Sequence, residues 1–376
     1  MESAVKLARA SSIAGSAPRT FEAGVANRST NPRIIVNMRS MSAGLGGVQR
    51  YVNEVSARLG DKLERIAPVR PLQGIKGHLW EQCWLSGKIS SRLLWSPANT
   101  GPLLCEQQVL TVHDLAAIDH PEWFATKFSA WYRFLLPRLV RSVRRVVAVS
   151  EFTKQRLVEI AGVDPMKITV IPNGVDQRFR PCAATAINGL RMRLKIPSER
   201  YVLSLGTVEP RKNLPVQLDA WSRCVERLPA DTWLVIAGRV GQRHVFSNVN
   251  IERVPPRIHF TGFVPDADLP TLYSGALALL YPSIYEGFGL PALESMASGT
   301  VPIVSNSTAL PEVVADCGLT VDPSDGDAIA AAITSLVRSP LMHRDMRERA
   351  IRRAQSFTWE KTAAMTWEVL CQASAQ

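Results

Sequence analysis

The feature that most constrains the fold of this chain is an alternation of short apolar runs with amphipathic or small-residue stretches. In the second half the runs are rich in β-branched residues, and we predict strands at Tyr201–Val208, Trp233–Ala237, Ile258–Val264, Leu277–Tyr281 and Val301–Ser305. Helix-like stretches such as Leu214–Leu228 and Leu290–Ala297 lie between several of them. This order predicts a parallel sheet with helices on both faces. Such sheets bind ligands beyond the carboxyl ends of their strands.

The first half has a similar but less regular pattern. We expect strands or strand ends at Arg33–Asn37, Leu94–Pro97, Val109–His113 and Val146–Ser150. A glycine-rich loop precedes a predicted helix at Val48–Leu59, and Ser150 is a suitable N-cap for the helix that begins at Glu151. At roughly 100–200 residues per domain, the length favours two domains. The sequence therefore predicts an α/β protein with two Rossmann-like domains.

Turn and linker signals set the expected boundaries. The turn Pro172–Val175 and the stretch Pro181–Pro197 separate the halves, and Thr358 is the expected cap of a last helix. Residues 1–30 lack the apolar core of a secretory signal. We expect a mobile tail at 1–30, an N-terminal domain at 31–180, a linker at 181–198, a C-terminal domain at 199–355 and a final helix within 356–376.

The charge is unevenly distributed along the chain. Residues 1–180 carry 25 Lys and Arg against 14 Asp and Glu, whereas residues 181–376 carry 19 of each. A basic first half indicates an anionic partner, such as phospholipid, a diphosphate-linked substrate or nucleic acid. No apolar run approaches the roughly 18 residues that span a bilayer. The six cysteines have no zinc-ligand spacing, and scattered thiols favour a cytoplasmic location.

The strongest chemical motif is Glu286–Pro291, which is followed by Glu294 and lies after a predicted strand. Two carboxylates thus flank a glycine-rich turn and the start of a helix. The glycines let the backbone approach a ligand closely, and the helix N-terminus directs free N–H groups at a phosphate. Glu286 can accept hydrogen bonds from sugar hydroxyls, and Glu294 from a ribose. The alternative is a strand–turn–helix corner with two solvated glutamates.

A second motif, Gly206–Asn213, contains the adjacent cations Arg211 and Lys212 at the carboxyl end of a predicted strand. The planar guanidinium and the compact ammonium together suit a diphosphate, so we expect no metal site. An exposed turn with two surface charges is the alternative. The D-x-D at Asp266–Asp268 directly precedes a predicted helix at Leu269–Ala276, and we interpret it as a helix cap.

Together these motifs resemble those of retaining glycosyltransferases with the GT-B fold, specifically family 4 (glycosyl transferases group 1), which includes bacterial mannosyltransferases of polysaccharide assembly. The resemblance extends from about Arg33 to Leu370. Supporting matches are Pro172–Val175, His259–Val264 and Leu310–Val313. It implies two Rossmann-like domains whose parallel sheets face a central cleft. It also implies that the helix Phe357–Leu370 crosses back onto the N-terminal domain.

The resemblance implies a role for each motif. Arg211 and Lys212 would hold the donor diphosphate, Glu286 would bind the transferred sugar and Glu294 the ribose. His113 and Asp114 would lie near the reacting centre, although a lone His-Asp is otherwise typical of a turn. The candidate catalytic residues are His113, Asp114 and Glu286. The other donor-binding candidates are Gly46, Gly47, Phe263, Val264, Gly287, Phe288, Gly289 and Leu290.

The expected activity is metal-independent, cofactor-free transfer of a hexose to a glycan or a polyprenyl-diphosphate-linked saccharide, in exopolysaccharide or O-antigen synthesis. The motif Gly206–Asn213 looks most like those of bacterial mannosyltransferases, so GDP-mannose is the favoured donor and UDP-glucose the alternative. A nucleic-acid-binding protein is the rival of another class, but the absence of RRM, KH and finger motifs weighs against it. A sugar phosphorylase or epimerase of the same fold is a further alternative.

The stretch Thr126–Val146 is typical of a helix with two faces. The face expected toward the core carries Phe128, Tyr132, Leu135, Leu139 and Val143. The opposite face carries Lys127, Trp131, Phe134, Arg138, Arg141 and Arg145. Cations interleaved with rings suit an anionic lipid surface, so we expect peripheral binding to the inner face of the cytoplasmic membrane. A solvated basic helix is the alternative, and Pro137 can rotate the pattern by kinking the helix.

Overall fold

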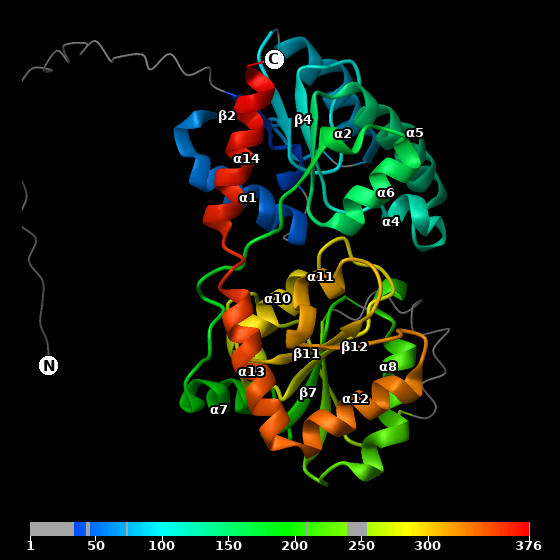
Figure 1. The fold of residues 1–376 in the computed structure, drawn as a ribbon, viewed down its shortest axis with the longest axis vertical. Coiled ribbons are helices and arrows are strands. Elements are labelled where there is room, and N and C mark those ends of the chain that lie inside the picture. The colour runs from blue at the N-terminus through cyan, green and yellow to red at the C-terminus, as the bar shows by residue number, and fades with distance from the viewer. Residues whose placement is uncertain are drawn as a thin grey trace, which may run out of the picture. The chain divides into compact units, whose positions relative to one another are not determined.

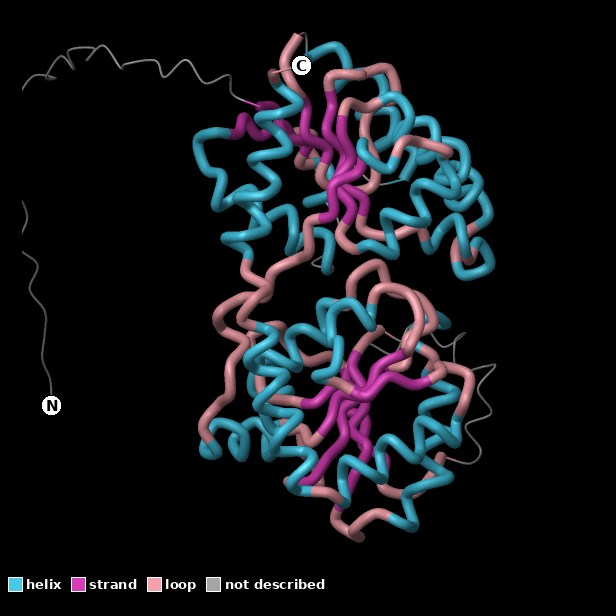
Figure 2. The backbone as a smooth tube through the Cα atoms, in the orientation of Figure 1, coloured by secondary structure: helices cyan, strands magenta, loops and turns pink. Residues whose placement is uncertain are grey.

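The structure is a computed structural model, and it describes residues 34–42, 46–72, 74–89, 91–207, 209–238 and 254–375. The expected tail at residues 1–30 lies outside the described residues, as do Gly44, Leu45 and Val208 of the two glycine-containing motifs. The described chain forms two parallel sheets of six strands each, one in each half of the sequence. Helices cover both sheets (Figures 1 and 2), which confirms the predicted α/β organisation.

The N-terminal sheet has the strand order β2-β1-β3-β4-β5-β6. Its strands are β1 (Ile34–Asn37), β2 (Leu63–Ile66), β3 (Leu94–Ser96), β4 (Gln108–Val112), β5 (Arg145–Ala148) and β6 (Ile168–Val170). Its helices are α1 (Gly47–Leu59), α2 (Gly74–Leu79), a π-helical segment (Trp80–Leu85), α3 (Ser86–Ile89), α4 (Ala116–Asp119), α5 (Thr126–Ser142) and α6 (Glu151–Ala161). The Ser150 side chain accepts a hydrogen bond from the Thr153 amide, so the predicted cap of α6 is confirmed.

The C-terminal sheet has the strand order β12-β11-β10-β7-β8-β9. Its strands are β7 (Arg200–Leu205), β8 (Thr232–Ala237), β9 (Ile258–Gly262), β10 (Ala278–Tyr281), β11 (Val301–Ser305) and β12 (Leu319–Val321). Its helices are α8 (Leu214–Cys224), α9 (Leu269–Gly275), α10 (Leu290–Ala297), α11 (Leu310–Val314), α12 (Gly326–Arg338) and α13 (Pro340–Ala354).

Both faces of the C-terminal sheet are buried. Successive strand residues point to opposite faces, so Leu203 belongs to one hydrophobic cluster and Val202 to another. The same division separates Leu279 from Leu280 in β10. A sheet covered on both faces needs continuous apolar strands, and this is why the strands of this half were easy to predict.

Two segments connect the halves. Residues 181–198, expected as a linker, contain α7 (Ala184–Arg193), whose Leu190 is buried with the core of the C-terminal half. The last helix, α14 (Trp359–Ser374), begins at Thr358, whose side chain caps it as predicted. This helix packs against α1 (Figure 1), and Trp359 and Leu370 are buried in the N-terminal core.

Helix α5 differs from its prediction in two respects. Its apolar stripe lies on Leu135, Leu136, Leu139 and Val140, so the expectation that Phe128 faces the core is wrong, and Phe128 is 40% exposed. Leu136 and Val140 are buried as well, so the apolar face of the helix is wider than expected. The helix also ends at Ser142, because the chain turns there to enter β5. Val143 and Arg145 therefore lie beyond it, and the Arg145 side chain donates to the Met166 carbonyl.

Candidate functional site

Two cavities lie where α1 of the N-terminal half meets α10 of the C-terminal half. They have volumes of about 220 and 470 Å³ and share Gly47, Leu290 and Pro291 in their walls. The smaller cavity is lined by His113, Asp114, Arg211, Lys212, Glu286, Gly287, Phe288 and Gly289. The larger is lined by Gly46, Phe263, Val264 and Glu294. Residues from five separate sequence segments thus meet in one region.

The cations of the smaller cavity are fixed by the turn that follows β7. Asn213 ends this turn in a left-handed conformation (φ 58°), and its buried side chain donates to the carbonyls of Pro282 and Pro323. These bonds fix the short 3-10 turn that carries Arg211 and Lys212. The two cations are therefore held by the backbone before any ligand arrives.

Glu286 lies between these cations and is 6% exposed. The Lys212 Nζ is 2.6 Å from Glu286 Oε1, and the Arg211 Nη1 is 3.9 Å from Glu286 Oε2. The Tyr281 hydroxyl donates to Glu286 Oε1 at 2.7 Å. Burial by itself would raise the pKa of Glu286, but Lys212 and Arg211 hold it below its ordinary value. The carboxylate is therefore ionised at neutral pH and can accept hydrogen bonds.

The turn before α10 requires its glycines. A Cβ at Gly287 would lie 1.8 Å from the His113 carbonyl oxygen, which belongs to the other half of the chain. The Gly287 carbonyl accepts hydrogen bonds from the Ser150 and Thr153 hydroxyls. Gly289 has a φ of 103°, and a Cβ there would meet Leu310 at 2.4 Å. The turn therefore docks closely against the N-terminal half and places the N-terminus of α10 beside the cavities.

His113 directly follows β4, and it is almost fully buried. Nε2 lies 2.7 Å from the Pro97 carbonyl oxygen, so it carries the hydrogen and donates. The ring packs edge-on against Tyr51 at 4.8 Å. Burial lowers the pKa of His113 to about 4. The imidazole is therefore neutral at physiological pH, so no imidazolium is present there to donate a proton.

Glu294 lies on the inner wall of the larger cavity and is 4% exposed. The Tyr273 hydroxyl donates to its Oε2 at 3.2 Å. Burial raises the pKa of Glu294 to about 7, although the adjacent Arg50 lowers it. Val264 is buried beside this cavity, and Phe263 is 58% exposed.

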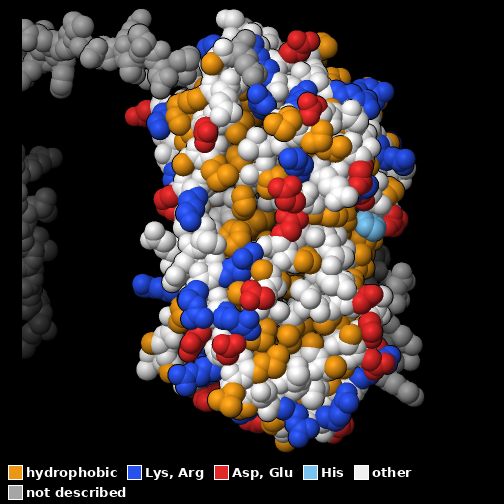
Figure 3. Space-filling model, viewed as in Figure 1, with side chains coloured by type: hydrophobic (Ala, Val, Ile, Leu, Met, Phe, Trp, Pro, Cys, Tyr) orange, Lys and Arg blue, Asp and Glu red, His pale blue; other side chains and the backbone are white. Residues whose placement is uncertain are grey.

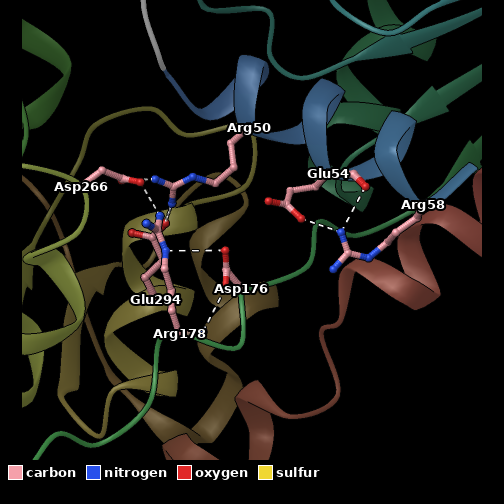
Figure 4. Close-up of polar contacts among 7 residues, drawn as sticks. All are labelled: Arg50, Glu54, Arg58, Asp176, Arg178, Asp266 and Glu294. Atoms are coloured by element: carbon pink, nitrogen blue, oxygen red, sulfur yellow. Dashed lines mark hydrogen bonds and ion pairs between the residues drawn. The ribbon is translucent and has the colours of Figure 1, made fainter. Parts of the chain in front are cut away.

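Ion pairs surround this wall (Figure 4). Arg50 of α1 contacts both Glu294 and Asp266, and Arg178 contacts Asp266 and Asp176. The prediction missed Arg50, Asp176 and Arg178, because they meet these carboxylates only through tertiary contacts. The only sequence signal was the position of Arg50, one turn after Gly47.

The D-x-D lies at the start of α9 as predicted, but neither aspartate side chain caps the helix with a hydrogen bond. Asp268 occupies the N-cap position of α9, but its side chain makes no capping bond and pairs with Arg193. Its backbone is already helical (φ −90°, ψ −15°), whereas capping needs an extended N-cap residue. Asp266 points instead to Arg50 and Arg178 at the larger cavity.

Comparison with known proteins gives consistent matches. The family model described as Glycosyl transferases group 1 matches residues 190–356, and that of Glycosyltransferase Family 4 matches residues 91–179. The chain is 30% identical to O-antigen chain mannosyltransferase B of Escherichia coli over 295 residues, which are 77% of this chain and 76% of that protein.

Two solved structures are similar in fold. Sucrose-phosphate synthase from Thermosynechococcus elongatus matches with a TM-score of 0.73 and 20% identity, over 91% of this chain and 99% of that one. HepE from Anabaena, solved with UDP-glucose, matches with a TM-score of 0.71 and 17% identity, over 90% and 99% of the two chains.

Proposed function

Because the chain belongs to the glycosyltransferases of group 1 and family 4, we propose that it transfers a hexose with retention of configuration from a nucleotide sugar bound at the two cavities. Its fold is the GT-B fold that the sequence predicted. The observation that carries the proposal is the cluster of Arg211, Lys212 and Glu286 beside the N-terminus of α10. Two cations and a helix N-terminus suit a diphosphate, and an ionised carboxylate suits sugar hydroxyls.

The proposed mechanism uses charge stabilisation and alignment. Arg211 and Lys212 stabilise the charge that develops on the leaving diphosphate. Glu286 orients the sugar, since Lys212 and Tyr281 hold its Oε1 in place. The acceptor attacks from the face that the diphosphate leaves, and a diphosphate oxygen takes up the acceptor's proton. The two fixed cations do the work that a divalent metal does elsewhere, so turnover needs none.

We favour GDP-mannose as the donor and a glycan or lipid-linked saccharide of O-antigen synthesis as the acceptor. The similarity to an O-antigen chain mannosyltransferase supports this choice. UDP-glucose remains the alternative donor, and HepE, a protein of the same fold, was solved with it.

A thermal-shift panel tests the choice of donor. A ligand at 100 times its Kd stabilises the folded state by roughly 2.7 kcal/mol, which is easily measured. We expect GDP and GDP-mannose to raise the melting temperature in EDTA. A shift with UDP-glucose and none with GDP-mannose would reverse the choice of donor and leave the enzyme class unchanged.

The membrane is a second proposed partner. No helix among the described residues is long and apolar enough to cross a bilayer. Between α2 and the start of α5, however, an apolar-lined cavity of about 450 Å³ opens beside Ile75, Leu79 and Phe128, which are 73%, 57% and 40% exposed. Lys127 lies in its wall, and Arg138 is exposed further along α5. Exposed apolar side chains next to cations favour an anionic lipid surface.

Only part of the expected cationic face of α5 is exposed. Trp131 is half-buried against His78, and Arg141 donates to the Ala161 carbonyl at 2.6 Å. Phe134 and Arg138 remain exposed and stack on each other. On the face drawn in Figure 3, Lys and Arg side chains are interspersed with Asp and Glu, so no single basic patch covers that face.

A further inference from the structure

Arg50 reaches from α1 of the N-terminal half into the C-terminal half. One of its terminal nitrogens contacts Glu294 Oε1 and the other contacts Asp266 Oδ1 (Figure 4). Its guanidinium also lies 5.7 Å from the Phe179 ring. Its side chain is 21% exposed and lines the larger cavity. A cation from one half of the chain thus holds two carboxylates of the other.

Arg50 contacts the Glu294 oxygen that is proposed to accept a hydrogen bond from the ribose. Glu294 Oε2 is bonded to Tyr273, which is fully buried, so Oε2 faces the core. Oε1 is the other oxygen of this cavity-lining glutamate, and Arg50 contacts it. Within the part of the chain that the structure describes, Arg50 is the only ion-pair partner of Glu294.

The contact with Asp266 is different, because Asp266 has a second cation. Arg178 contacts its other oxygen, Oδ2, and also pairs with Asp176 at 3.5 Å. If Arg50 leaves Glu294, it can stay paired with Asp266. The Arg50–Glu294 pair can therefore open without leaving the guanidinium unpaired.

We propose that Arg50 is a displaceable gate on the ribose subsite: it pairs with Glu294 until the ribose of the donor displaces it from that carboxylate. The inference rests on the proposed function, which supplies the role of Glu294. While it is closed, the gate holds the two halves together, and it lowers the affinity for nucleosides. A diphosphate without a ribose does not meet the gate.

The test compares a nucleotide with its phosphate part alone. Isothermal titration calorimetry would measure the Kd of GDP and of inorganic pyrophosphate for the parent protein and for Arg50→Ala. We expect Arg50→Ala to bind GDP about tenfold more tightly and pyrophosphate unchanged. Arg50→Lys keeps the charge but cannot reach both carboxylates, and we expect a smaller gain. Arg58→Ala is the matched control, because Arg58 lies two turns further along α1, pairs with Glu54 (Figure 4) and with Glu360, and lines neither cavity.

A Glu294 variant separates the Arg50 gate from the proposed role of Glu294 in ribose binding. Glu294→Gln should weaken GDP binding, and adding Arg50→Ala to it should give no further tightening, because no ion pair remains to be broken. Weaker GDP binding by Arg50→Ala would overturn the gate and make Arg50 a donor ligand. Equal tightening of pyrophosphate would also overturn it. An unchanged GDP affinity in Glu294→Gln would instead remove Glu294 from the proposed ribose site.

Discussion

At the scale of single residues, Lys212 and Arg211 matter because both lie beside the Glu286 carboxylate, and Arg211 also pairs with Glu209. In the proposed mechanism the donor diphosphate binds these two cations, while Lys212 and Tyr281 keep Glu286 in place for the sugar. Burial lowers the pKa of Lys212, which leaves it more easily deprotonated when it has no anionic partner. We expect the anionic diphosphate to keep Lys212 protonated.

We predict that Arg211→Ala and Lys212→Ala each lower kcat/KM by about 100-fold or more, corresponding to roughly 3 kcal/mol of lost transition-state stabilisation. Activity should be unchanged in excess EDTA. The measurement is steady-state turnover of each variant with and without EDTA. If both variants keep nearly the parent kcat/KM and turnover needs a metal, then Arg211 and Lys212 do not stabilise the leaving diphosphate.

Glu294 gives a prediction for stability. Its pKa is raised by burial to about 7 from an ordinary value of 4.5. An acid whose pKa is higher in the folded state takes up a proton on folding, so its contribution to stability is present below about pH 4.5 and is lost as the pH rises to 7. The free energy of unfolding should therefore fall, relative to Glu294→Gln, by about 3 kcal/mol over this window. Thermal unfolding of both proteins between pH 5 and 8 measures the difference, and parallel curves would contradict it.

At the scale of elements, the turn between β10 and α10 brings the two halves into contact through its backbone. A Cβ at Gly287 would meet a carbonyl oxygen of the other half, and backbone cannot yield as a flexible side chain does. Gly287→Ala should therefore hold the halves apart and lower kcat/KM about tenfold or more. Gly189→Ala in α7 has open space around its Cβ and should leave turnover unchanged. Equal activity of the two variants would show that the close approach at Gly287 is not needed for transfer.

Helices α2 and α5 give a prediction for the membrane. Binding to anionic vesicles should fall when Lys127 and Arg138 are changed to Ser, and again when Ile75 and Phe128 are changed to Ser. Only the first pair should alter the salt dependence, because salt screens charges but not apolar insertion. Vesicle co-sedimentation at low and high salt measures both effects. If neither pair of substitutions reduces binding, this surface is not the membrane contact.

Much of the element pattern could be predicted from the sequence, for an identifiable reason. Strands buried on both faces are continuous apolar runs, so β7, β8 and β10 were clear. By contrast, β6 and β12 are three-residue edge strands with partly exposed residues, so they lack the continuous buried run that marks the equally short β3.

At the scale of the whole molecule, the site depends on contacts between residues far apart in the chain. Candidate ligand-binding residues that share one local turn, such as Arg211 and Lys212, could be predicted from the sequence. The pairing of Arg50 with Glu294 spans 244 positions and could not, since neither residue is unusual in its own segment. The same applies to Glu312 of α11, which accepts hydrogen bonds from the Glu151 and Phe152 amides at the start of α6.

We propose that this glycosyltransferase moves mannose with retention of configuration and without a metal. The most direct measurement is a ¹H NMR time course of the purified protein with GDP-mannose and a mannose-terminated glycoside acceptor in EDTA. We predict that GDP-mannose is consumed, that the new glycosidic signal has the α configuration of the donor, and that Lys212→Ala abolishes it. A β-configured product, or consumption of GDP-mannose no faster than with Lys212→Ala, would contradict the account.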